Sequence, residues 1–466
     1  MNVLFILSDD QRTDTIAAYG DAVGGPIKTP SIDSMVARGS FFRNAYCMGS
    51  NSGAVCGPSR AMILTGRSLN RMGNPFDIAE EFVTMPERFR AAGYDTFYSG
   101  KWHSGKPAFA RGFTHGGSIF FGGMGSHTAL GVHDFDPAGE YPNESRRPLT
   151  EFSSTEFVTR AVEFLGDRDE LKPFFAMVSF TAPHDPRTPP GDYATMYDPA
   201  QLSLPPGFMP VHPFDNGEMV IRDEKLAHWP RTESETTRHL ADYYGMISHM
   251  DAQIGRLLDE LDRRGLREST IIVFASDHGL AIGSHGLMGK QNLYEHSTKA
   301  PLIVIDPRNN ASDSRGSECR GLVYLLDIFP TVAELADIEI RSVEGRSLAG
   351  CVGGCARSGV REIGAARACA GREFLFTAYK DLQRAVRDER WKLIVYSKIN
   401  RVQLFDLEND PFEQRDLAGV AGYEAQVNRL LERLQGLQAR AGDEQELFSG
   451  SPSSPVFDHA AAEDSR

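Results

Sequence analysis

Three features are scarce or missing in this chain of 466 residues. No run of about 18 apolar residues occurs, so the sequence predicts no membrane-spanning helix and no membrane partner. Basic residues are in deficit, since 49 Lys and Arg face 63 Asp and Glu, for a formal net charge of −14. A nucleic acid would require a clustered basic face, so no nucleic-acid partner is expected. An anionic small molecule would need positive charge supplied locally.

Cysteine is also scarce, because six residues in so long a chain do not make a disulfide framework. Cys351 and Cys355 lack a second cysteine pair that would complete a zinc site. The apolar stretch Val3–Leu7 has no basic region before it and does not resemble a secretory signal. As it stands, the sequence predicts a cytoplasmic protein. A chain trimmed of a leader would look the same and would be periplasmic or secreted.

Short apolar runs bounded by turn residues predict strands that are buried on both faces of a parallel sheet. These runs are Val3–Leu7, Thr96–Tyr98, Phe174–Phe180, Ile271–Ala275 and Leu302–Ile305. Helical patterns alternate with them, and the clearest runs from Thr236 to Arg264 with apolar residues three and four apart. This alternation predicts an α/β fold, a large mostly parallel sheet flanked by helices.

The predicted secondary structure changes at about residue 372, from alternating strands and helices to successive strands. Four strand-like segments follow, Glu373–Tyr379, Gln383–Arg387, Lys392–Tyr396 and Val402–Asp406, and then one helical stretch, Tyr423–Arg440. We therefore predict a catalytic α/β domain over residues 1–371, a small C-terminal antiparallel sheet with a helix over 372–448, and a flexible tail over 449–466. Residues 124–150 and 183–230 are rich in Gly, Pro and His and predict long loops.

Charged and polar residues follow four of the predicted strands, at the edge where ligands of parallel sheets bind. The strand exits are Ser8-Asp9-Asp10, Gly100-Lys101-Trp102-His103, Ala182-Pro183-His184 and Ser276-Asp277-His278-Gly279. Asp9 and Asp10 alone could be turn residues or helix caps. As neighbours they repel each other unless a cation lies between them, and with Asp277 they offer three oxygen ligands to a hard divalent ion. These oxygen ligands make Ca²⁺ the expected ion. Because His278 adds a nitrogen donor, which is less usual for calcium, Mn²⁺ or Mg²⁺ is an alternative.

The segment Cys56-Gly57-Pro58-Ser59-Arg60 is the second candidate site. An isolated cysteine is more often a buried structural residue. A thiol phosphatase loop has five residues between Cys and Arg, whereas this segment has three. Pro58 suits the first turn of a helix, which would place Cys56 at a helix N-terminus, where free N–H groups favour an oxyanion.

This segment, followed by Leu64-Thr65-Gly66-Arg67, resembles the signature of the type I sulfatases, and Gly93–His103 resembles their second signature. Further similar segments are Val3–Asp10, Thr29–Asp33, Ser276–Lys290 and Leu404–Pro411. The resemblance therefore spans nearly the whole chain. It implies the alkaline phosphatase-like fold.

The resemblance also implies a modified nucleophile. In this family a separate formylglycine-generating, or sulfatase-maturating, enzyme converts the signature cysteine to an aldehyde that hydrates to a diol. By resemblance Cys56 is that residue. One hydroxyl of the diol would attack sulfur, and the other would then expel sulfate.

The roles that the resemblance implies extend to most of the strand-exit residues. One divalent cation would be held by Asp9, Asp10, Cys56, Asp277 and His278. Arg60 would hold the oxygen of the nucleophile, and His103 would act as base for the second hydroxyl. Lys101 and Lys290 would bind the sulfate oxygens. His184 would protonate the leaving alkoxide, alone or with Lys290.

The substrate class is predicted from a third segment. Ser179–Arg187 resembles sulfatases that act on sulfated sugars, so we expect a sulfuric ester hydrolase of a sulfated carbohydrate, with Asp185 and Arg187 as sugar contacts. His278 stands where many relatives carry Asn, although some carbohydrate sulfatases carry His. Phosphonate monoester and phosphodiester hydrolases of the same superfamily share the Asp-His pair, and they are the alternative. A non-catalytic binder of sulfated glycans is a further alternative, with an unmodified thiol at Cys56.

Overall fold

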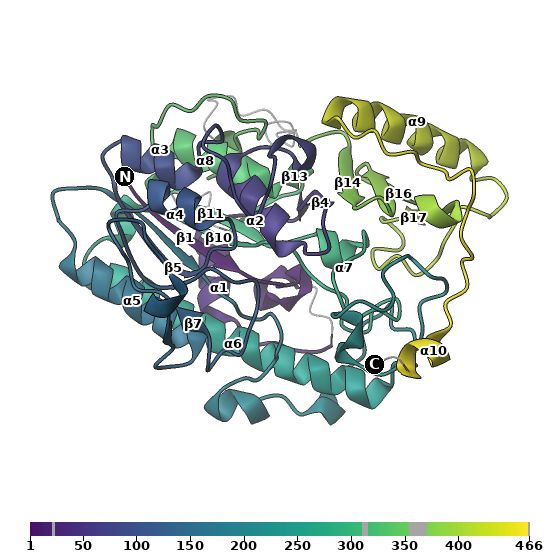
Figure 1. The fold of residues 1–466 in the computed structure, drawn as a ribbon, viewed down its shortest axis with the longest axis horizontal. Helices are drawn as coiled ribbons and strands as arrows, with labels where there is room; N and C mark the ends of the chain where they lie inside the picture. The colour runs from purple at the N-terminus through teal and green to yellow at the C-terminus, as the bar shows by residue number, and fades with distance from the viewer. Residues whose placement is uncertain (21–23, 310–315, 354–370, 465–466) are drawn as a thin grey trace.

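The computed structural model describes residues 1–20, 24–309, 316–353 and 371–464. A large sheet with helices on both faces forms the body of the molecule, and a smaller sheet under one long helix lies to its right in Figure 1. The predicted α/β class is thereby confirmed. Cys355 of the sequence analysis lies outside the described residues.

Within the described residues the large sheet has eight strands in the order β12-β2-β11-β10-β1-β9-β5-β6. They are β1 (Asn2–Ser8), β2 (Ser40–Phe42), β5 (Asp95–Lys101), β6 (His115–Phe120), β9 (Phe174–Ser179), β10 (Thr270–Ser276), β11 (Leu302–Ile305) and β12 (Ser317–Cys319). β10, β1, β9, β5 and β6 run parallel, whereas β11 runs antiparallel to both of its neighbours. The carboxyl ends of β1, β5, β9 and β10 therefore share one edge, as predicted.

Helices cover both faces of this sheet because the side chains of β1 alternate between two apolar clusters. Val3, Phe5 and Leu7 pack in the cluster that includes α2 (Cys56–Thr65), α3 (Met85–Ala91) and α8 (Ile328–Leu335). Leu4 and Ile6 pack in the cluster of α1 (Pro30–Arg38), α5 (Ser153–Asp167) and α6 (Glu233–Arg263). In Figure 1, α2, α3 and α8 lie above the sheet, and α5 and α6 lie below it.

The smaller sheet has the order β17-β16-β15-β14-β4. Its strands are β4 (Gly49–Ser50), β14 (Leu375–Tyr379), β15 (Gln383–Arg387), β16 (Trp391–Tyr396) and β17 (Arg401–Asp406). β14 to β17 pair antiparallel, but β4 comes from the segment just before α2 and pairs parallel with β14. The C-terminal sheet is thus joined directly to the chain that leads into the predicted nucleophile.

Helix α9 (Glu424–Ala441) covers the smaller sheet and buries Leu430 and Leu434 against it. Residues 449–464 return across the molecule and end in α10 (His459–Asp464). The Trp229 N–H donates to the Glu463 carboxylate over 2.9 Å, so this end of the segment is anchored. The division into domains at residues 371 and 448 stays a prediction.

The remaining elements are short. They are β3 (Ala45–Tyr46), β7 (Gly131–Val132), β8 (Arg147–Pro148), β13 (Val323–Tyr324), α4 (Lys106–Gly112) and α7 (Glu295–Thr298). The predicted loops over 124–150 and 183–230 contain only β7, β8 and single 3-10 turns among the described residues. No helix in the described ranges combines the length and apolarity needed to cross a membrane.

Candidate active site

The carboxyl ends of β1 and β10 bring three acidic side chains together. Asp10 has a left-handed backbone (φ 66°), and its N–H donates to the Asp277 carboxylate over 3.2 Å. The Tyr243 hydroxyl of α6 donates to the Asp10 carbonyl over 2.6 Å and accepts from the Arg12 N–H over 2.9 Å. Asp9, Asp10 and Asp277 are buried, at 0 to 1% exposure. Residues more than 260 positions apart therefore form one acidic site.

Helix α2 delivers the predicted nucleophile to this site. Cys56 is its first residue, and the Ser59 hydroxyl donates to the Asp277 carbonyl over 2.6 Å, which fixes the first turn of α2 against the end of β10. The Cys56 Sγ lies 3.2 Å from His278 Nε2 and 3.9 Å from Asp10 Oδ1. Cys56 thus lies at a helix N-terminus beside the acids, as the sequence predicts.

These side chains fit a divalent cation. The ligand atoms of Asp9, Cys56, Asp277 and His278 lie within 4.8 Å of one another, and so do those of Asp9, Asp10, Cys56 and His184. Asp9 Oδ1 is buried and has no hydrogen-bond partner among the described residues. A cation among these groups would satisfy that oxygen, and a mainly carboxylate set suits a hard ion. The predicted ligand set is therefore physically consistent, and the Asp9 oxygen is the observation that favours a cation.

Three cationic side chains offset the buried carboxylates. The Lys101 ammonium contacts Asp9, Arg60 Nε lies 2.9 Å from Asp277, and Lys290 Nζ lies 2.7 Å from Asp10 Oδ1. Burial alone would raise the pKa of Asp9, but Lys101 and then Arg60 lower it well below the usual range. Burial, and then Asp9, raise the pKa of Asp277. Lys290 Nζ also lies 3.2 Å from the Cys56 sulfur, so it reaches the nucleophile.

The surroundings of Cys56 oppose a thiolate. Burial, and then the Asp9 carboxylate, raise the pKa of the thiol well above its usual value. A plain thiol here is neutral and a weak nucleophile, because the thiolate is the reactive form. A divalent cation among the carboxylates would reverse the local field and favour an anion at this position.

The two histidines predicted for proton transfer lie in different environments. His184 Nε2 lies 3.8 Å from Asp10 Oδ2, while its Nδ1 lies 2.8 Å from the Asp185 carbonyl oxygen. That contact orients the ring with Nε2 toward the acids. The His103 ring packs 5.3 Å from the Phe76 ring, and its Nδ1 is buried without a partner among the described residues. Burial, and then Lys101 and Arg60, lower the pKa of His103 to about 2, so the ring is neutral.

The two predicted sugar contacts differ in availability. The Asp185 carboxylate accepts from both terminal nitrogens of Arg222, Nη1 and Nη2, so it is already paired within the protein. Arg187 has its Nη1 3.5 Å from His239 Nδ1, while its Nε and Nη2 are buried with no hydrogen-bond partner among the described residues. Arg187 therefore still has hydrogen-bond donors to offer a ligand, whereas the carboxylate oxygens of Asp185 are already paired with Arg222. Both roles stay predictions.

Three residues at the site were missed by the sequence reasoning. Tyr243 lies within the predicted helix Thr236–Arg264, and its hydrogen bond to Asp10 was not foreseen. Phe76 lies over Gly57, where a Cβ would come within 2.3 Å of its ring. Arg222 lies in a predicted loop and binds Asp185. No motif signals these residues, because each acts through a contact that only the folded chain creates.

The fold and the site define a hydrolase of the alkaline phosphatase-like α/β class, with a cysteine at a helix N-terminus beside a buried acidic cluster. Residues 1–338 match the family described as Sulfatase, and residues 283–440 match the family described as N-sulphoglucosamine sulphohydrolase, C-terminal. The chain belongs to the sulfatase family of sulfuric ester hydrolases. A divalent metal and formylglycine are typical of this family.

Known relatives span the whole chain. An arylsulfatase of Clostridium perfringens is 28% identical, with 98% of each chain covered. An N-acetylglucosamine-6-O-sulfatase of Bacteroides thetaiotaomicron is 26% identical over 95% of this chain and 87% of its own. A solved structure in complex with its substrate D-glucosamine-2-N,6-O-disulfate superposes with a TM-score of 0.77 at 23% identity, covering 96% of this chain and 99% of its own. The predicted family, fold and enzyme class are thereby confirmed.

Proposed function

We propose that this chain removes sulfate from a sulfated carbohydrate, using a formylglycine made from Cys56 and one divalent cation. The observation that carries the proposal is the position of the Cys56 sulfur. It lies at the N-terminus of α2, 3.2 Å from both His278 Nε2 and Lys290 Nζ, and within the acidic cluster. The neutral thiol itself is a poor nucleophile there, which supports conversion by a maturating enzyme as a partner reaction.

The cation would be held by Asp9, Asp10, Asp277, His278 and residue 56, with Ca²⁺ expected because oxygen ligands dominate. Mn²⁺ or Mg²⁺ is the alternative. When present, the cation supplies positive charge and the formylglycine hydrate supplies two hydroxyls. Arg60 positions Asp277 through its Nε and also reaches the Lys101 carbonyl and the Ser179 hydroxyl, over 2.9 and 2.5 Å. It thereby joins the carboxyl ends of β5, β9 and β10.

The remaining polar side chains handle charge and protons. Lys290 reaches the nucleophile and can stabilise negative charge that develops on the sulfate oxygens, and Lys101 is proposed for the same task. His184 presents Nε2 to the site and is proposed to protonate the leaving sugar oxygen. The neutral His103 is proposed to accept a proton from the second hydroxyl. Its unpartnered Nδ1 is consistent with a ring that is held by packing against Phe76.

The carbohydrate part of the proposal rests on relatives. One curated relative is named for N-acetylglucosamine 6-O-sulfate, and one similar structure contains a disulfated glucosamine as its substrate. Arg187 supports the same substrate class, since buried guanidinium nitrogens without partners can donate to an anionic or hydroxyl group of a sugar. Asp185 is proposed to act on the sugar only indirectly, by orienting His184.

The test combines mass spectrometry with a substrate panel. The peptide containing residue 56, from protein matured in its native host, should show the mass of an aldehyde or its hydrate in place of a thiol. The matured protein should release sulfate from at least one sulfated saccharide, and Cys56→Ala should release none. Faster turnover of phosphonate monoesters or phosphodiesters than of every sulfate ester would favour the alternative hydrolase. An unmodified thiol, with saccharide binding unchanged in Cys56→Ala, would favour a non-catalytic binder.

A further inference from the structure

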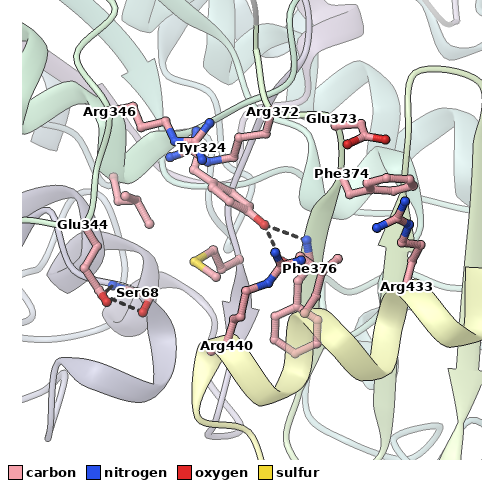
Figure 2. A pocket seen from close by; sticks show the side chains of 14 residues that line it. Ser68, Tyr324, Glu344, Arg346, Arg372, Glu373, Phe374, Phe376, Arg433 and Arg440 are labelled. Atoms are coloured by element: carbon pink, nitrogen blue, oxygen red, sulfur yellow. Dashed lines mark hydrogen bonds between the residues drawn. The ribbon is translucent and has the colours of Figure 1, made fainter.

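A cavity of about 540 Å³ lies between the smaller sheet with its helix α9 and the segments around Ser68, Tyr324 and Glu344, and none of the predicted catalytic residues lines it. Its floor and walls come from α9, from Phe374 and Phe376 of the β14 region, and from the segments around Tyr324 and Glu344 (Figure 2). Ser68 also lines it and follows the C-terminal end of α2. The lining contains none of the residues predicted to hold the cation, the nucleophile or the sulfate.

Four arginines line this cavity in a protein whose net charge is −14. They are Arg346, Arg372, Arg433 and Arg440, and Figure 2 shows them on opposite sides of the space. We name this group the arginine cavity. Such a concentration runs against the overall acidity of the chain, so it sets a local positive field in the cavity.

The carboxylates nearby offset only part of this charge. Arg372 is neutralised by Asp327, with Nη2 2.7 Å from Oδ1. Glu344 accepts from the Ser68 hydroxyl over 2.6 Å and pairs with Arg71 outside the cavity over 3.0 Å. Glu373 is the other carboxylate of the lining. Within the described ranges no ion pair is made by three of the arginines, Arg346, Arg433 and Arg440. Among the described residues, the cavity therefore holds three unpaired guanidinium groups and one unpaired carboxylate, that of Glu373.

Helix α9 contributes one face to the cavity lining. Arg433, Leu437, Arg440 and Ala441 are separated by four, three and one residues and therefore share one face, next to the face that buries Leu430 and Leu434. The Arg433 guanidinium lies 5.1 Å above the Phe374 ring, which orients it without consuming its hydrogen-bond donors. The helix thus supplies one oriented cation, Arg433, and a second cation, Arg440, with Leu437 between them.

Ring faces and apolar groups complete the lining. The Tyr324 hydroxyl is fixed by the backbone of Phe376, donating over 2.9 Å and accepting over 2.6 Å, so its ring is held rigidly at the cavity wall. Met48, Leu326 and Leu437 add apolar surface. The volume is in the range of small-molecule sites, which are largely apolar with a few polar groups that fix orientation.

We infer that the arginine cavity is a second ligand site, for a sugar that carries a sulfate or phosphate ester. The planar guanidinium groups of Arg346, Arg433 and Arg440 match the oxygens of a tetrahedral oxyanion, and the apolar and aromatic wall matches the C–H face of a sugar ring. The inference rests on the cavity alone and does not depend on the reaction at Cys56.

Isothermal titration calorimetry with glucose 6-sulfate and glucose 6-phosphate tests the inference. The Cys56→Ala protein is used so that the sulfate ester is not consumed. We expect the Cys56→Ala protein to bind the probes. When Arg433→Gln and Arg440→Gln are added to it, the affinity should fall at least tenfold, because the loss of a hydrogen bond to a charged group lowers affinity by about that factor. Binding should also weaken between about 50 and 500 mM salt, as expected for a partly exposed charged site.

Arg390→Gln is the matched control, since Arg390 is also a partly exposed arginine but pairs with Asp406 away from the cavity. It should bind both probes as the parent does, and thermal unfolding should show that all the variants are folded. Tighter binding of the sulfate ester would identify a sulfated saccharide as the occupant, and tighter binding of the phosphate ester a phosphorylated sugar. Equal affinity of the double variant and the control, or no saturable binding of either probe, would overturn the inference.

Discussion

The Tyr243→Phe substitution tests how the acidic site is held in place. The Tyr243 hydroxyl is fully buried and makes two hydrogen bonds, to the Asp10 carbonyl over 2.6 Å and from the Arg12 N–H over 2.9 Å. Removing it leaves two buried backbone groups unpaired, which costs about 2–4 kcal/mol of unfolding free energy. Since Asp10 holds an uncommon left-handed backbone, we expect its carboxylate to shift as well.

Two measurements follow from this reasoning. Urea denaturation should show the loss of stability, and calorimetric titration should show divalent-cation affinity lowered by about 10- to 100-fold, the range for residues that orient metal ligands. Tyr244→Phe is the matched control, because Tyr244 neighbours Tyr243 on α6 and its hydroxyl has no hydrogen bond within the described part of the chain. Unchanged cation affinity in Tyr243→Phe, or an equal loss in Tyr244→Phe, would refute the proposed support of Asp10.

Three further results are expected. Gly100→Ala should destabilise the protein by several kcal/mol in urea titrations, because Gly100 has φ 109° and an added Cβ would lie 1.8 Å from the Ser179 carbonyl oxygen. Gly436→Ala is the control: this glycine lies on the open surface of α9, and the substitution should stabilise the protein by about 1 kcal/mol. Burial raises the pKa of Asp251 to about 6, above its value in the unfolded chain. The unfolding free energy should therefore fall as pH rises from about 4 to 6, by about 3 kcal/mol more than in Asp251→Asn. If the unfolding free energies of the two proteins changed in parallel with pH, Asp251 would not be the cause. Asp277→Ala should abolish both cation binding and sulfate release, and full turnover in that variant would remove the cation from the reaction.

The positions of the acids and of Cys56 could be predicted from the sequence because local signals specify them. The apolar strands Val3–Leu7 and Ile271–Ala275 end in acids, and topology requires the ends of parallel strands to meet at one edge. The Cys-x-Pro-Ser-Arg segment places its cysteine at a helix start through the preferences of proline and the residues after it. These inferences needed no knowledge of distant contacts.

Other features depended on contacts between distant parts of the chain. Leu302–Ile305 was predicted as a strand of the parallel sheet, and its direction was wrong, since β11 runs antiparallel to both neighbours. A run of four buried apolar residues has the same pattern in parallel and antiparallel pairing. The pairing of β4 with the C-terminal sheet was missed, because a strand of two residues, Gly49–Ser50, is too short to show an alternating pattern. The same holds for side-chain partners: Asp185 was expected to face a sugar, yet it is engaged by Arg222, 37 residues away.

The sequence by itself therefore determined the family, the sheet with helices on both faces, and the cluster of acids, histidines and one cysteine at its edge. Only the tertiary structure decided which of those side chains are already paired, which donors remain open, and that α6 supports Asp10 through Tyr243. The arginine cavity also exists only in the folded chain, since its lining runs from Met48 to Ala441, 393 positions apart. The physical reason is that residue type and spacing encode local conformation and burial, whereas pairing depends on where side chains lie in space.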